Sequence, residues 1–356
     1  MGLFGKKKKK EESKEEQKFT GKVGCLSESQ EDCLNQLKQH IADNQLTTSD
    51  RYTDHYLLRF CRARSFKVKE VKKMFEEFIK WREENEVEYA FLRYDLSNIP
   101  KVREIHQAGY HGTDREGRPF YIDRPCTAHP IEDLLKIADI AELSRNYIRD
   151  YEFLIHAKMP ACSAAAGKKI DSILSVIDVK GISMGMFKQK SRDTLNIPVG
   201  ITQNYYPEIM HKMIIINAPL VFKAIWAVVK TFLAKETLAK IQIIGTKYQD
   251  KLFECVDPDN VPAAIGGNCT CADRGGDCFR SDKGPWEIYR GDKYGEMYKR
   301  QMAGDPLTIP IPDPVPAPPI SIADPSIQIP APTSVGSGFV PAPSPAPVSM
   351  APGAPQ

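Results

Sequence analysis

The chain has 356 residues, of which 42% are hydrophobic and 27% charged, a balance typical of a protein with a sizeable folded core. The net charge of +3 is too small to suggest a nucleic-acid-binding protein. Nine cysteines without a regular spacing, and no apolar export segment at the N-terminus, indicate a reducing, cytosolic compartment. Lys223 and Lys230 interrupt the longest apolar region, so we expect no membrane-spanning helix and a protein that is soluble or peripheral to a membrane.

Residues 1–20 are polar and predict a basic, flexible tail. The stretch MGLFGKKKKK combines Gly2 with five lysines, and one acyl chain plus a basic run would form a membrane tether. The usual myristoylation pattern has Ser or Thr at the position of Lys6, and four glutamates follow between Glu11 and Glu16. Acylation of Gly2 with membrane attachment, and a merely solvated tail, both remain open.

Region 21–95 has the apolar spacing of a helical module. Ser27 can cap a helix that runs through EDCLNQLKQHIAD. The later segment DHYLLRFCRARSFKVKEVKKMFEEFIKWREEN carries apolar residues at helical spacing. They are Leu57, Phe60, Cys61, Val71, Met74, Phe75, Phe78 and Trp81.

Region 96–303 alternates short β-rich segments with helical patterns. The segments are GRPFYID at 117–123, SILSVIDVKG at 172–181, KMIIINAP at 212–219 and KIQIIG at 240–245. Each is rich in β-branched residues and bounded by Gly or Pro. Helical patterns between them predict an α/β fold with a largely parallel sheet.

Residues 304–356 form a tail of a different kind. Sixteen prolines from position 305 onward exclude helices and central strands, so we expect an extended, disordered segment. Stretches such as PAPSPAP could bind proline-reading adaptor domains, but a solvated tail that limits self-association is the favoured interpretation.

Catalytic and metal-binding motifs are not apparent. AAAGKKIDS lacks the glycine and the hydroxyl residue of a phosphate loop, and no dinucleotide, zinc-protease or nucleophile-elbow motif occurs. Cys269, Cys271 and Cys278 in CTCADRGGDC offer three thiols without a Cys-x-x-Cys pair or a fourth ligand nearby. We therefore expect an exposed loop with free thiols and no metal site.

A very apolar segment, 219–233, precedes a small polar one. Its bulky residues fall almost all round a predicted helix, which suits either a core helix or a mobile lid over an apolar cavity that meets a membrane. Thr237 and Lys240 follow three residues apart, on the same side of a turn. A hydroxyl and an ammonium so placed could bind a phosphate, although exposed Thr/Lys pairs are common.

Five blocks, in this order, resemble the CRAL-TRIO family. They are LLRFCRARSF, YHGTDREGRPFY, MPACSAAAGKKIDSILSVIDVKGISM, QNYYPEIMHKMIIINAP and GTKYQDKLFECVDPDNVPAAIGG. The chain is most similar to the fungal secretory phosphatidylinositol/phosphatidylcholine transfer proteins, over roughly residues 30–290. The resemblance implies a helical N-terminal lobe, a lipid-binding lobe with a sheet floor, one bound phospholipid, and a helix that opens on membranes.

The resemblance also implies roles for individual residues. The family's inositol phosphate is held by a Thr-x-x-Lys pair, matched here by Thr237 and Lys240. Glu208 of the YYPE block matches a glutamate near the inositol, and Arg62 or Arg64 matches a basic residue that positions it. The gating helix would present the apolar residues Phe222, Ile225, Trp226, Val229, Phe232 and Leu233 to the acyl chains.

Two departures from the family concern the ligands. Ile209 stands where the family has the arginine of YPER. The family's phosphatidylcholine site uses a Ser and a Thr two apart on one strand, with tyrosines, and the matching strand positions here are Ile173 and Ser175. Tyr110 and Tyr121 are retained. Phosphatidylinositol is therefore the safer expectation, and the second ligand is weakly bound phosphatidylcholine or another hydrophobic molecule.

Together these features predict a phosphatidylinositol-binding and transfer protein, monomeric and not an enzyme. It would exchange one phospholipid at Golgi or endosomal membranes and present phosphatidylinositol to lipid kinases, without a cofactor. Two alternatives remain: a carrier of a sterol or tocopherol, and an interaction scaffold that acts through its proline-rich tail.

Overall fold

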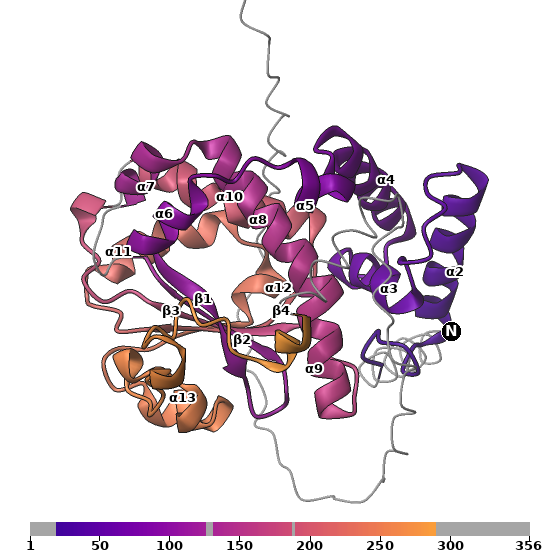
Figure 1. The fold of residues 1–356 in the computed structure, drawn as a ribbon. Coiled ribbons are helices and arrows are strands. Elements are labelled where there is room, and N and C mark those ends of the chain that lie inside the picture. The colour runs from indigo at the N-terminus through magenta and orange to yellow at the C-terminus, as the bar shows by residue number, and fades with distance from the viewer. Residues whose placement is uncertain (1–18, 126–130, 187–188, 290–356) are drawn as a thin grey trace, which may run out of the picture. The chain divides into compact units, whose positions relative to one another are not determined.

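The computed structural model describes residues 19–125, 131–186 and 189–289, all of which lie in one compact unit of the chain, Met1–Val315 (Figure 1). Gly2, the basic run and the predicted proline-rich tail lie outside the described residues. Within the described part, no helix is both long enough and apolar enough to cross a bilayer.

The first helices form the predicted module: α2 (Glu28–Asp43), α3 (Asp54–Ala63) and α4 (Val68–Glu84). Ser27 caps α2 as predicted, because its hydroxyl accepts from the backbone N–H of Gln30 while the Gln30 side chain accepts from the backbone of Ser27. The apolar faces of the three helices meet in one core, and its fully buried aromatic residues are Phe60, Phe75 and Phe78.

Short helices lead from this module to the sheet: α5 (Ala90–Arg93) and α6 (Ile99–Ile105). The five strands are β1 (Gln107–Thr113), β2 (Pro119–Arg124), β3 (Ile173–Asp178), β4 (Met210–Ile216) and β5 (Ile241–Ile243). Their order in the sheet follows the chain, with β1 antiparallel to β2 and every other pair parallel. The prediction of a largely parallel sheet is confirmed.

All four predicted strands are present, but the edge strand β1 was missed. Its sequence, QAGYHGT, lacks the β-branched alternation that marks the other four. Gly112 has a φ of +67°, and the pairing with β2 shifts register between Tyr110 and Thr113. A bulged, glycine-containing edge strand leaves only a weak pattern in the sequence.

Alternation along the strands directs side chains to two different surroundings (Figure 1). On β3, Leu174 and Val176 pack against α13 (Gln249–Cys255) and the segment that follows it. The opposite face meets a layer of helices, seen above the sheet in Figure 1. These are α7 (Ile131–Ile137), α8 (Ile140–Phe153), α10 (Gln189–Tyr205) and α11 (Phe222–Val229), together with α6.

The N-terminal module is joined to the helix layer by buried polar and aromatic contacts. Arg82 on α4 makes a two-bond ion pair with Glu152 on α8, at 2.7 and 3.1 Å. Trp81 stacks on Tyr205 at the end of α10, with ring centroids 4.0 Å apart. Beyond α8, the chain continues through a π-helical turn, Leu154–Lys158, into α9 (Met159–Ala166).

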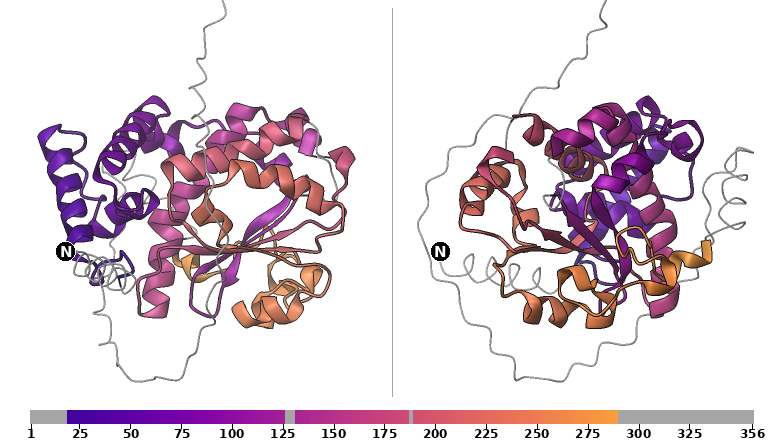
Figure 2. Two further views of the ribbon diagram at one scale, coloured as in Figure 1. Left: turned by 180° about the vertical axis from the view of Figure 1, so that it is seen from behind. Right: turned by 60° about the vertical axis from the view of Figure 1, so that its left-hand side comes forward.

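The loop after α13 corrects one expectation. Cys271 and Cys278 are buried and Cys269 is half-buried, so this is not an exposed thiol loop. The loop runs back along the sheet and lies against β1, since the backbone N–H of Gly112 donates to the carbonyl of Lys283 at 2.6 Å. Figure 2 shows this part of the chain, in orange, from two further directions.

Candidate functional site

A cavity of about 1480 Å³ lies between the sheet and the helices α6, α8, α10 and α11. Aliphatic and aromatic side chains from all five strands and from these helices form most of its wall. Small-molecule sites usually occupy about 300–1,000 Å³. The cavity is therefore large enough for a ligand with long apolar chains.

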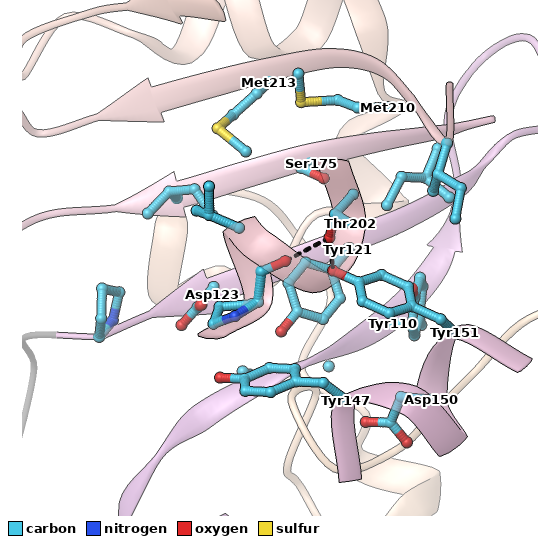
Figure 3. A pocket seen from close by; sticks show the side chains of 18 of the residues that line it. Tyr110, Tyr121, Asp123, Tyr147, Asp150, Tyr151, Ser175, Thr202, Met210 and Met213 are labelled. Carbon is cyan, nitrogen blue, oxygen red and sulfur yellow. Dashed lines mark hydrogen bonds between the residues drawn. The ribbon is translucent and has the colours of Figure 1, made fainter. Parts of the chain in front are cut away.

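The residues predicted for the second ligand form one row across the sheet floor. Tyr110 pairs with Tyr121, Tyr121 with Ser175, and Ser175 with Met213 on four neighbouring strands. All four line the cavity (Figure 3), and the two tyrosine rings lie 5.0 Å apart. Burial raises the pKa of Tyr110 and of Tyr121, so both hydroxyls stay protonated and can donate hydrogen bonds.

Ile173 lies on the same face of β3, two residues before Ser175, and also lines the cavity. It packs against Ile209 and Tyr206 in a buried apolar cluster. Where a hydroxyl side chain could reach into the cavity, this chain places a sec-butyl group. Strand β3 thus offers one hydroxyl to the cavity, that of Ser175, and not two.

A second polar group lies where α11 returns to the sheet. Thr237 is in α12 (Lys235–Leu238), and Lys240 follows it just before β5; both line the cavity. The Lys240 ammonium lies 3.2 Å from Oε1 of Glu208, and Oε2 of Glu208 lies 3.7 Å from Nε of Arg62. The structure therefore brings Lys240, Glu208 and Arg62 together from three separate parts of the chain, with Thr237 one turn before Lys240.

The two candidate arginines differ in position. Arg64 is among the residues that line the cavity, whereas Arg62 is not. Arg62 instead donates to the backbone carbonyl of Gly21 at 3.0 Å and pairs with Glu208 from outside. Arg64 is thus the one placed to face a ligand, and Arg62 holds the carboxylate of Glu208.

Arg59, which no sequence motif indicated, holds the backbone around Glu208 in place. It is buried on α3, and its guanidinium donates to the backbone carbonyls of Asp171 at 2.5 Å and Glu208 at 3.4 Å. Glu208 has a φ of +59°, an uncommon conformation for a residue with a side chain. Arg59 therefore helps to hold the loop that aims Glu208 at Lys240. Its sequence signal is a single charge inside the apolar run YLLRFC.

The helical wall adds polar groups that no motif indicated. The hydroxyl of Tyr151 lies 2.6 Å from Oγ1 of Thr202, and both residues appear beside Tyr121 in Figure 3. At one end, Nε2 of His106 lies 2.8 Å from Asp123. Burial alone would lower the pKa of His106, but the charge and hydrogen bond of Asp123 outweigh it and raise that pKa. The cavity thus has polar points along both walls.

The predicted gating helix is present but shorter than expected. α11 ends at Val229, Lys230–Phe232 form a 3-10 turn, and Leu233 has extended backbone angles. The predicted helix thus ends in a 3-10 turn that includes Phe232, and Leu233 lies just beyond it. The extended residues after the 3-10 turn are held from outside the helix, since the Gln203 side chain accepts from the backbone N–H of Ala234 at 3.0 Å.

Exposure divides α11 into two sides. Phe222 and Ile225 are buried against β3 and β4, and Trp226, Val229 and Leu233 also line the cavity. Lys223 and Lys230 lie on the surface, and Leu220 just before the helix is 84% exposed. The helix closes the apolar cavity while leaving a bulky apolar side chain at its outer end.

Comparison with known proteins agrees with this architecture. The family model described as "CRAL/TRIO domain" matches residues 104–267, which contain the five strands and the helices α8, α10 and α11. The model described as "CRAL/TRIO, N-terminal domain" matches residues 33–77, within the helical module. A solved structure, "Crystal structure of Sfh5", superposes with a TM-score of 0.56 over 78% of this chain and 99% of that one; at 14% identity it shows the fold alone.

Two relatives are similar in sequence. "SEC14 cytosolic factor" of Candida glabrata is 34% identical over 266 residues, covering 75% of this chain and 87% of that protein. "Phosphatidylinositol/phosphatidylcholine transfer protein SFH12" of Arabidopsis thaliana is 37% identical over 271 residues, 75% of this chain, and the match spans 48% of that longer protein. The chain belongs to the CRAL-TRIO family.

Proposed function

We propose that this protein binds one phospholipid in its cavity and transfers it between membranes, with phosphatidylinositol as its main ligand. The observation that carries the proposal is an apolar cavity of about 1480 Å³ with a hydroxyl and an ammonium at one side. Moving one acyl methylene from water into apolar surroundings is favourable by about 0.8 kcal/mol. A protein can therefore take lipid chains out of a bilayer only if an enclosed apolar cavity shields them from water. Relatives named as phosphatidylinositol/phosphatidylcholine transfer proteins support the same ligand class.

The headgroup would bind at Thr237 and Lys240. Lys240 pairs with Glu208. An inositol phosphate can replace that contact, with Lys240 supplying charge, Thr237 a directed hydrogen bond, and Glu208 a hydrogen-bond acceptor for inositol hydroxyls. Arg64 lines the cavity, and we expect it to be the arginine that meets such a ligand.

Phosphatidylcholine would be a weaker second ligand. Its binding would use Ser175, Tyr110 and Tyr121 on the sheet floor, where Ile173 removes one possible hydroxyl contact.

We propose that lipid enters at a cytosolic membrane surface when α11 swings outward, with Leu220 in the bilayer interface. The protein would act as a monomer and present phosphatidylinositol to lipid kinases; proline-reading adaptors are further candidate partners.

The test compares wild type with Thr237→Val/Lys240→Ala. The Lys240–Glu208 pair is partly exposed, with 29% and 23% of the side chains accessible, so its loss should change stability by less than about 1 kcal/mol. A hydrogen bond to a charged group contributes about 1.5–3 kcal/mol, which predicts phosphatidylinositol binding weaker by about 10- to 150-fold. Transfer of labelled phosphatidylinositol between vesicles, and native mass spectrometry of the loaded protein, measure this loss.

Two controls make the result specific. Lys251→Ala removes an exposed lysine on α13 and should leave transfer unchanged. Phosphatidylcholine transfer by the double variant should also persist. If wild type retains no phospholipid, or retains a sterol, the protein is a carrier of another ligand and this proposal is wrong. If removal of residues 305–356 abolishes activity while lipid binding is intact, the protein is instead an interaction scaffold.

A further inference from the structure

Four potential metal ligands meet beside the edge strand β1. His111 comes from the strand itself, and Cys269, Cys271 and Cys278 come from the loop after α13, about 160 residues later in the chain. Their ligand atoms all lie within 4.8 Å of one another. The sequence showed three thiols without a fourth ligand because His111 approaches them only through the tertiary fold.

Two of the distances between these ligand atoms are close to those of a tetrahedral thiolate site. Zinc–sulfur bonds of about 2.3 Å place two sulfurs of a tetrahedron about 3.8 Å apart, and a zinc–nitrogen bond of about 2.0–2.1 Å places nitrogen about 3.6 Å from sulfur. Sγ of Cys269 and Sγ of Cys271 are 3.8 Å apart. Sγ of Cys271 is 4.0 Å from Nδ1 of His111, which needs to close by only a few tenths of an ångström.

The surroundings are buried and incompletely hydrogen-bonded. His111 is fully buried, and its Nε2 has no hydrogen-bond partner among the described residues. Its Nδ1 faces the thiols and lies 3.0 Å from Oγ of Ser281, which itself donates to the carbonyl of Cys278. Nδ1 is therefore the ring nitrogen placed to bind a metal beside the thiols, in exchange for its contact with Ser281.

We propose that His111, Cys269, Cys271 and Cys278 bind one zinc ion as a structural site. Three sulfurs and one imidazole are a known structural zinc set, and soft thiolate donors in tetrahedral geometry favour zinc over magnesium or calcium. Four protein ligands leave no open coordination position, so the ion would have no catalytic role.

The zinc site would attach the loop after α13 to strand β1. A side chain at Gly109 would collide with the carbonyl oxygen of Phe279 at 2.1 Å, which shows how closely the loop lies on β1. Just beyond Cys278, Asp282 pairs with the buried ammonium of Lys158. The loop carries little regular secondary structure of its own, so few backbone hydrogen bonds fix its position. A metal ion bound by the loop and by β1 would supply that attachment.

This attachment reaches the lipid cavity. Trp286 follows the loop, is almost fully buried, and contacts the ring of Tyr110 edge-on at 6.1 Å. Trp286, Tyr110 and Phe279 all line the cavity. The zinc ion would therefore hold in place the segment that closes this end of the cavity.

The experiment measures metal bound to the full chain, purified without a histidine tag or chelator and with a reductant present. Mass spectrometry of the elements should find about one zinc per wild-type chain, and Cys278→Ser should bind far less. Cys255→Ser, at a half-buried cysteine outside the cluster, should keep its zinc. His111→Cys, which restores four ligands, should bind more than His111→Gln.

A second readout does not depend on how the variants fold. Apo wild-type protein titrated with Co²⁺ should develop the visible bands of a tetrahedral cobalt–thiolate site, saturating at one equivalent and reversed by zinc. Chelator treatment should lower the Tm of the wild type, and added zinc should restore it. Folded wild-type protein that binds no zinc or cobalt under reducing conditions, or that holds a disulfide among the three cysteines in place of metal, would overturn the proposal.

Discussion

Replacing Glu152 by glutamine removes the charge at the centre of the contact between the N-terminal module and the helix layer. Glu152 and Arg82 are 1% and 3% exposed, and Glu152 also accepts a hydrogen bond from the hydroxyl of Tyr206 at 2.6 Å. Loss of one partner of a buried ion pair usually costs about 3–5 kcal/mol when the other charge is left unpaired. Arg82 keeps a second carboxylate, since Oε1 of Glu88 lies 2.7 Å from its guanidinium, so we expect the low end of that range, about 3 kcal/mol. For a domain of this size that corresponds to a fall in Tm of about 6–12 °C.

Urea unfolding followed by tryptophan fluorescence measures this change, since Trp81 lies at the same contact. Glu84→Gln is the matched control: it is the same substitution on α4, at an exposed pair with Lys80, and should change stability by less than about 1 kcal/mol. Equal effects of the two substitutions at pH 7 would refute the argument.

The pH dependence gives an independent check. Burial opposes the charge of Glu152, but Arg82 and His156 outweigh it and hold the pKa of Glu152 well below its ordinary value. A lowered carboxyl pKa contributes stability that is present above the unfolded value of about 4.3 and lost as the pH falls toward the folded value. The stability difference between wild type and Glu152→Gln should therefore be constant from about pH 6 to 7 and shrink below about pH 4.3. A difference that grows in acid would contradict this assignment.

Two further predictions concern ligand and membrane. Ile173→Thr restores a second hydroxyl on the strand of Ser175 and should raise phosphatidylcholine transfer relative to phosphatidylinositol, as measured with labelled lipids, while Ile173→Val, which adds no hydroxyl, should not. Leu220→Asp places a charge at the 84% exposed position before α11 and should weaken vesicle binding in a flotation assay without changing the Tm. Unchanged flotation would show that another part of the protein surface contacts the membrane.

Local patterns in the sequence were enough for much of the fold. The capping box at Ser27, the apolar spacing of α3 and α4, and the four β-rich segments each reflect interactions between residues close in the chain. The same is true of the polar Thr237 and Lys240, whose separation of three residues was visible in the sequence. Their role in lipid binding remains a prediction.

The length of α11 could not be derived from its composition. Apolar residues continue through Phe232 and Leu233, yet the helix stops at Val229, because the chain must turn toward α12 and is fixed there by the bond between Gln203 and Ala234. Hydrophobic pattern alone cannot show such an end when no glycine or proline marks it.

Composition, periodicity and motif order thus determined the class of fold, most elements and the kind of ligand to expect. The tertiary structure alone decided which distant side chains meet: Tyr110, Tyr121 and Ser175 in one row, Arg59 beneath Glu208, and His111 among three cysteines. The physical reason is that strand pairing and loop packing join residues separated by tens to more than a hundred positions, and no local pattern records those separations.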